Sequence, residues 1–171
     1  MIDKSYVATM ARYNAWQNSQ LTDIVTHMDH EALELDRGAF FGSILGTLNH
    51  LLWGDRIWLN RFGADVDAPE LPLAQSAALT PTVAAWGAER FQVDGRLTIW
   101  ADGLHNLDLA GGLTWFSGSV KTKVTRPFAE CVVHMFNHQT HHRGQVHAML
   151  TAAGQSAPVS DLFIMNTQNG R

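Results

Sequence analysis

The chain has 171 residues, of which 46% are hydrophobic and 16% charged, so we expect one domain over 1–171 with a substantial core and no extensive disorder. Its net charge of −4 at pH 7, with basic residues clustered only in the scattered KTKVTR segment, argues against nucleic-acid binding. A lone Cys131 cannot form an internal disulfide, and no segment resembles a secretory signal or a membrane span, so a cytoplasmic location without membrane insertion is expected.

The first predicted element is a long helix over roughly 3–29, where apolar residues recur at steps of three and four or their multiples. Asn14 and Gln17 fall on the same apolar stripe. Polar side chains at such positions either face a buried polar site or rotate to the edge of the stripe, and the pattern leaves both interpretations open.

A second helix is predicted over roughly 40–62, where apolar residues cover most of the helix circumference. Such a helix either lies at the centre of a bundle or shares a face with a second subunit. The following segment, 63–81, contains one glycine and three prolines and predicts a long crossover connection.

A third helix is predicted over roughly 80–104, with Arg90 interrupting its apolar stripe. The next segment, GGLTWFSGSVKTKV, is compatible with a small β-hairpin around a Ser-Gly-Ser turn. Pro127 fits the first turn of a fourth helix, which should continue until Gly154, and the segment VSDLFIM adds one short turn. The predicted fold class is therefore an all-α bundle of four helices with a small hairpin between the third and fourth.

The fourth helix contains the chemically most informative segment, HMFNHQTHHRGQVH, with histidines at positions 134, 138, 141, 142 and 147. At 100° per residue the first four fall within an arc of roughly 100°, whereas His147 points away. His138 and His142 occupy stripe positions where core residues are expected, and such a conflict between pattern and chemistry marks a functional site.

Two histidines one turn apart can place ring nitrogens about 2.0–2.1 Å from one metal ion. Helical geometry alone leaves open whether His138 is paired with His141 or with His142, and histidines on an amphipathic helix can also simply decorate a surface. A further ligand has to come from another helix. His50 is the candidate, because Gly46, Thr47 and Gly54 on its own face allow a cavity or a close helix contact. A buried, hydrogen-bonded histidine is the equally weighted alternative.

The remaining candidates have weaker patterns. His27, His30 and His105 lie at predicted helix ends and are expected on the surface. Cys131 shares the stripe of the fourth helix, where burial as a small apolar residue is favoured over a reactive thiolate.

Three segments together resemble the DinB-like family, part of the wider group of DinB and YfiT-like metalloenzymes: ARYNAWQN, LNHLLWGDRIWLNRF and HMFNHQTHHRGQVHAML. The likeness extends over nearly the whole chain. It implies an up-down-down-up bundle, usually dimeric, in which His50, His138 and His142 bind a divalent metal, so it selects His142 rather than His141. Related proteins use small thiols such as bacillithiol or mycothiol in transfer or isomerisation reactions, while others have no established activity.

Three neutral imidazoles leave a divalent ion its full charge and an open coordination position. Such an ion, with zinc or nickel the best candidates, lowers the pKa of bound water from 15.7 toward roughly 7 and deprotonates a bound thiol. We therefore hypothesise a metal-dependent thiol transferase or hydrolase acting on a small electrophile. The alternatives are a metal-binding or stress-related bundle without catalysis, and a bundle that binds a small apolar ligand.

Further roles near the metal are less specific. His134 and His141 could relay a proton or could be ordinary neighbours of the ligands, and no general base is assigned. Asn14, Gln17 and Trp53 are candidates to line the pocket.

Overall fold

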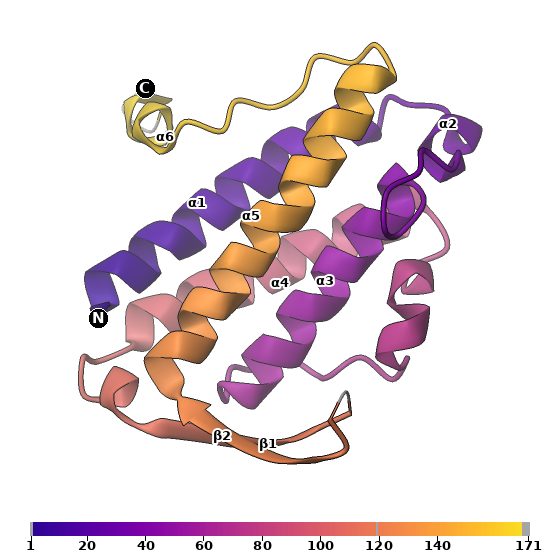
Figure 1. Ribbon diagram of the computed structural model, residues 1–171. Helices are drawn as coiled ribbons and strands as arrows, with labels where there is room; N and C mark the ends of the chain where they lie inside the picture. The colour runs from indigo at the N-terminus through magenta and orange to yellow at the C-terminus, as the bar shows by residue number, and fades with distance from the viewer. Residues whose placement is uncertain (1, 119, 169–171) are drawn as a thin grey trace.

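Four long helices form the bundle in the computed structural model, which describes residues 2–118 and 120–168. They are α1 (Lys4–Val25), α3 (Ile44–Arg61), α4 (Val83–Gly103) and α5 (Phe128–Ala152). Figure 1 shows α1 and α5 running in one direction and α3 and α4 in the other, which confirms the predicted up-down-down-up order. Because α3 and α4 are parallel, the chain between them has to return along the bundle, and this crossover contains the 3-10 helix η1 (Leu73–Ala78).

Side-chain caps determine where α3 and α4 begin, which the apolar pattern predicts only approximately. The hydroxyl of Ser43 accepts a hydrogen bond from the Gly46 amide (3.0 Å), so α3 begins at Ile44 and not near residue 40. Thr82 caps α4 in the same way through the Ala85 amide (3.2 Å). The first helix ends at Val25, and the chain then forms the short helix α2 (His30–Glu34), where the sequence predicted one helix to about residue 29.

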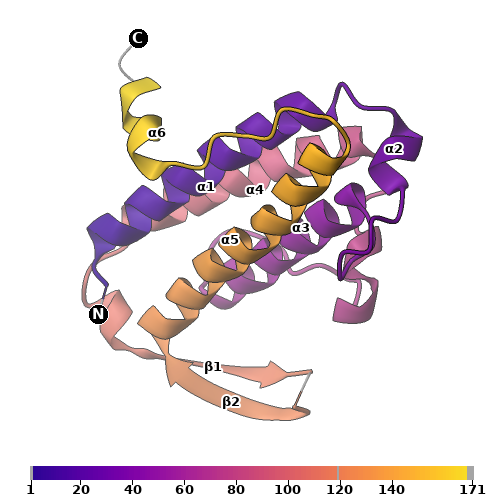
Figure 2. The same cartoon turned by 45° about the horizontal axis from the view of Figure 1, so that its top comes forward.

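The predicted hairpin is present at the end of the bundle where α5 begins (Figure 2). After the 3-10 helix η2 (Asp108–Ala110), strand β1 (Gly112–Ser117) pairs antiparallel with β2 (Thr122–Pro127), with Trp115 opposite Val124. The Trp115 ring packs edge-on against Trp58 of α3, 5.5 Å between centroids, and this contact ties the hairpin to the bundle. The tail adds the helix α6 (Leu162–Gln168).

The helix α3 is buried over much of its circumference by other parts of the chain. It packs against α4, α5, α2 and η1, and twelve of its residues are buried. Each fully buried Leu or Ile side chain contributes about 1.5–3 kcal/mol, so this helix anchors the core. Much of its apolar surface is therefore covered within the chain, while Trp53, Ile57 and Trp58 stay partly exposed. None of the helices in residues 2–118 and 120–168 combines the length and apolarity needed to cross a membrane.

A buried polar network joins α1, α3, α4 and α5; its members are Asn14, Asn18, Asp55, Arg90, Asp94, Gln139 and Arg143. Arg90 is its centre, because its guanidinium lies 2.8 Å from Asp55 Oδ2 and 2.9 Å from Asp94 Oδ1. With two arginines and two aspartates the network is formally neutral, as burial requires. Arg90, which interrupts the predicted stripe of the third helix, thus has a structural role inside the core.

Candidate metal centre

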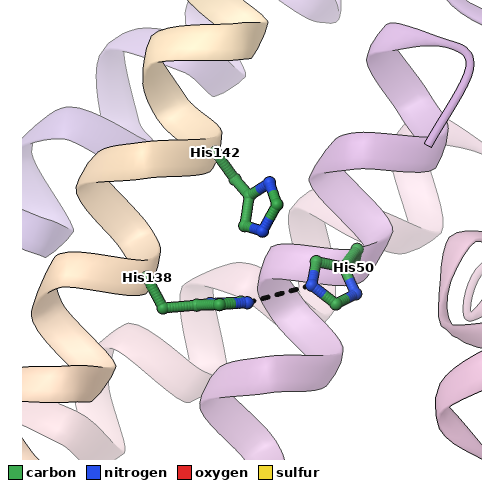
Figure 3. A group of neighbouring side chains, drawn as sticks. All are labelled: His50, His138 and His142. Atoms are coloured by element: carbon green, nitrogen blue, oxygen red, sulfur yellow. Dashed lines mark hydrogen bonds between the residues drawn. The ribbon is translucent and has the colours of Figure 1, made fainter. Parts of the chain in front are cut away.

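The three histidines His50, His138 and His142 come together between the antiparallel helices α3 and α5. Each has a ring nitrogen within 4.8 Å of one on each of the others, and Figure 3 shows His138 and His142 pointing from one helix toward His50 on the other. The two Nε2 atoms of His50 and His138 are 2.9 Å apart. The structure thus brings together the three predicted ligands, with His142 as the partner of His138.

Glycine at position 54 makes this approach sterically feasible. A Cβ atom at Gly54 would lie 2.9 Å from Cε1 of His138 and 3.3 Å from its Nδ1. The imidazole of His138 therefore packs directly over the backbone of α3, one turn after His50. The small residues around His50 predicted either a close helix contact or a cavity. Gly54 allows a close contact between α3 and the His138 ring.

Neighbouring groups fix the orientation of two of the rings. His50 Nδ1 lies 2.9 Å from the hydroxyl of Ser76 in η1, and His142 Nδ1 lies 2.7 Å from Oε1 of Gln145. An amide oxygen only accepts hydrogen bonds, so His142 carries its proton on Nδ1 and keeps the lone pair of Nε2 free. Histidine ligands of metals characteristically donate their other N–H to such a partner.

Burial keeps the rings uncharged at neutral pH. Desolvation, reinforced by the neighbouring histidines, lowers the pKa of His50 to about 4 and that of His138 to about 3. Desolvation also lowers the pKa of His142. Neutral imidazole is the form that binds a metal. The donor atoms around one tetrahedral ion lie about 3.3 Å apart, and the Nε2 atoms of His50 and His138, at 2.9 Å, are close to this separation. The three side chains therefore fit a divalent cation.

The three histidines open into a cavity of about 1260 Å³ between α3, η1, the hairpin and α5. Its walls are mainly aromatic and aliphatic. Trp53, predicted to line the pocket, does so, and its indole N–H donates to the Leu71 carbonyl (2.7 Å). Phe41, in the loop before α3, stacks on His50 with 3.8 Å between ring centroids. The aromatic wall leaves a ligand room to approach the histidines and reduces their contact with water.

The other histidines have different surroundings. His134 lines the cavity and packs edge-on against Trp58, 5.1 Å between centroids, so it remains a candidate for proton transfer. His141 is exposed and does not line the cavity, while His147 is exposed and faces away from the metal centre, as predicted. His27, His30 and His105 are exposed, as expected from their positions at helix ends.

Two predicted pocket residues are elsewhere, and this part of the prediction is wrong. Asn14 is buried beside a polar site, but that site is the buried polar network, where Asn14 contacts Asp55 and Arg143. Gln17 donates to the Val159 carbonyl of the tail. Cys131 is buried, as predicted, and burial raises the pKa of its thiol.

Comparisons with known proteins identify the family and support the fold. A model of the DinB family matches residues 1–170. Protein DinB of Bacillus subtilis (strain 168) is 26% identical over 166 residues, which cover 91% of this chain and 93% of that protein. The crystal structure of a DinB-like protein from Bacillus cereus has the same fold, with a TM-score of 0.63 at 15% identity over 84% of this chain and 90% of that one. The match over almost the entire length shows that this chain belongs to the DinB family.

Proposed function

We propose that this protein is a metal-dependent enzyme in which His50, His138 and His142 bind one divalent ion and a small thiol or water attacks an electrophilic substrate. One observation carries the proposal: three neutral imidazoles converge where a large apolar cavity ends. A purely structural zinc site is normally closed by four protein ligands, whereas three ligands beside a cavity leave a position for a reactant. A thiol transferase is the favoured reaction class, with a hydrolase as the variant that uses water.

The residues of the chain would divide the task as follows. The three imidazoles would hold zinc or nickel, whose charge lowers the pKa of a bound thiol or water. Ser76 and Gln145 keep two of the rings in place. Phe41 and Trp53 cover His50 and limit its access to water, which strengthens the electrostatic interactions at the site. A reduced thiol as reactant also fits the expected cytoplasmic location.

Metal analysis of the purified protein tests the first half of the proposal. We expect close to one equivalent of zinc or nickel per chain, directly or after reconstitution. His138→Ala removes one of three donors and should abolish tight binding, whereas His147→Ala changes an exposed histidine of the same helix and should bind metal like the wild type. Less than about half an equivalent in the reconstituted wild type would contradict the ligand assignment.

Activity assays test the second half. The metal-loaded protein is offered small thiols together with alkyl or aryl electrophiles, and consumption of the thiol is followed. Turnover that requires thiol, metal and His138 supports a transferase, and metal-dependent turnover without thiol supports a hydrolase. A stoichiometric metal complex that turns over none of these substrates would favour a non-catalytic metal-binding protein.

We also propose that the protein is a homodimer, paired through the outer face of α4. Gly87, Phe91, Gly95 and Ile99 form one row along this helix, and the two large side chains are 82% and 68% exposed. A glycine inside a helix costs about 1 kcal/mol relative to alanine, and a Cβ at Gly95 would touch no heavy atom within 4 Å. When two subunits are related by a twofold axis, Phe91 and Ile99 of each subunit could pack into the spaces above Gly87 and Gly95 of its partner.

Sedimentation at micromolar concentration tests this surface. The wild type should sediment as a dimer and Phe91→Asp as a monomer. Phe116→Asp, which alters a 65% exposed phenylalanine of the hairpin, should leave the dimer intact. A wild type that is monomeric, or a dimer unaffected by Phe91→Asp, would exclude this interface.

A further inference from the structure

The cavity beside the histidines has one permanent positive charge in its wall, Arg61. Among the described residues that line the cavity, it is the only arginine, lysine, aspartate or glutamate. Arg61 lies in the last turn of α3, and its guanidinium carbon is 4.8 Å from the ring centroid of Trp58 and 5.4 Å from that of Trp115. A tryptophan of the bundle and one of the hairpin thus hold a cation at the wall of an apolar space.

Unlike Arg56 and Arg96, Arg61 has no acidic side chain among the described residues to neutralise it. Arg56, on the same helix, lies 3.0 Å from Glu89, and Arg96 lies 2.7 Å from Asp65. Within the part of the chain that the structure describes, no carboxylate lies within 4.0 Å of the Arg61 guanidinium. A half-buried guanidinium keeps its charge at neutral pH, and its N–H donors favour a planar oxyanion. The missing partner could therefore be part of a ligand.

The dimensions of the cavity indicate what such a ligand would look like. Arg61 follows His50 by eleven residues, which corresponds to about 16 Å along the axis of α3, and side chains of a helix lean back toward its N-terminus. A molecule that reaches both the histidines and the guanidinium has to be elongated. Its middle part would be apolar, because aromatic side chains line the path. Two exposed apolar residues line the same cavity, Phe40 (83% exposed) and Leu73 (49%).

Building on the proposed function, we propose that Arg61 binds the carboxylate of an elongated substrate whose apolar body occupies the cavity and whose opposite end reaches the histidines. Arg61 would then position the substrate, and the hairpin would contribute to recognition through Trp115. The competing explanation is structural: an arginine at a helix C-terminus interacts favourably with the helix dipole, and its contacts with two indoles could simply hold the hairpin. The two explanations differ in whether the charge of the ligand matters.

The test uses two probes with the same apolar body, 6-phenylhexanoate and 6-phenylhexan-1-ol, with affinities measured by calorimetry. Metal-free protein is used first, so that the carboxylate cannot bind the ion, and the zinc-loaded protein is measured second. The wild type should bind the acid at least about tenfold more tightly than the alcohol, as expected for a charge-assisted contact. Arg61→Gln should remove this preference and change the alcohol affinity by less than about twofold. Arg56→Gln, the matched control, should behave like the wild type.

Several outcomes would overturn the proposal. One is equal affinity of the wild type for the acid and the alcohol, and another is a preference for the acid that persists in Arg61→Gln. If Arg61→Gln loses both probes, Arg61→Lys decides: it keeps the charge and should retain part of the preference, and its failure to do so would indicate a structural role. Zinc binding by each variant is measured in parallel. A wild type that binds no metal refutes the metal proposal, while the metal-free comparison still tests Arg61.

Discussion

Adding a single methyl group at Gly54 should damage the metal centre while leaving the bundle folded. In Gly54→Ala the new Cβ would lie 2.9 Å from Cε1 of His138, whereas carbon atoms pack best at about 3.5–4.0 Å. The ring therefore has to move by roughly 0.6–1 Å. Because ligand distances at a metal site tolerate only about 0.2 Å, we expect metal affinity to fall about 10–100-fold, or roughly 1.4–2.7 kcal/mol.

The stability of the metal-free protein should respond differently. Alanine is favoured over glycine inside a helix by about 1 kcal/mol. A displaced side chain costs about 0.5–1.5 kcal/mol, and the end of the His138 ring can swing away. The two effects nearly cancel, so the free energy of unfolding of metal-free Gly54→Ala, measured with urea, should stay within about 1 kcal/mol of the wild-type value.

The assay is competition with a chelator for zinc, combined with urea unfolding of the metal-free protein. Gly144→Ala is the matched control, since it adds the same methyl group to the middle of α5, where no heavy atom lies within 4 Å of the Cβ position. It should bind zinc like the wild type. If Gly54→Ala also retained wild-type affinity, the close contact between α3 and His138 would not be what positions this ligand.

Two further predictions concern stability. Metal-free protein should become less stable as the pH falls from about 6.5 toward 4: the pKa of His50 is about 4 and that of His138 about 3, so the unfolded chain takes up protons first in this window. Urea unfolding between pH 7.5 and 4.5 measures how the free energy of unfolding depends on pH. This dependence should be weaker when His50 and His138 are both replaced by glutamine, and an equal dependence would show that these two histidines do not cause it. Arg90→Met should lower the free energy of unfolding by about 3–5 kcal/mol, because Asp55 and Asp94 stay buried without their cation. Arg96→Met, which breaks an exposed pair, should cost less than about 1 kcal/mol, and equal effects of the two variants would argue against a special role of the network.

The helices and the hairpin could be predicted from local patterns, because periodicity and turn residues act over a few neighbours. The helix ends could not be predicted as well. The stripe of the first helix continues to Met28 in the sequence, but the helix stops at Val25, and Met28 packs against the core from the following turn. A pattern records which residues are buried and not whether the helix continues to them.

In the candidate site, too, local patterns predicted some residues, while others depend on how the helices pack. The stripe positions of His138 and His142 indicated a buried imidazole pair, because two polar rings stood where core residues belong. His50 needed the family resemblance, since its distance from the pair depends on how two helices dock. Asn14 was recognised as a polar residue in the core, yet its partners lie on other helices, and no local pattern shows which buried polar group it will meet. The same holds for Arg61, whose place in the cavity depends on the packing of the hairpin.

The sequence distance between His50 and His138, 88 residues, has a consequence for the order of folding. Closing a flexible loop of this length costs on the order of 4 kcal/mol in chain entropy, so the two helices should meet late, after local structure has formed. Tight metal capture requires that meeting. If the proposed site binds zinc, the rate at which a refolding chain takes zinc from a coloured indicator would therefore time the docking of α5 onto α3.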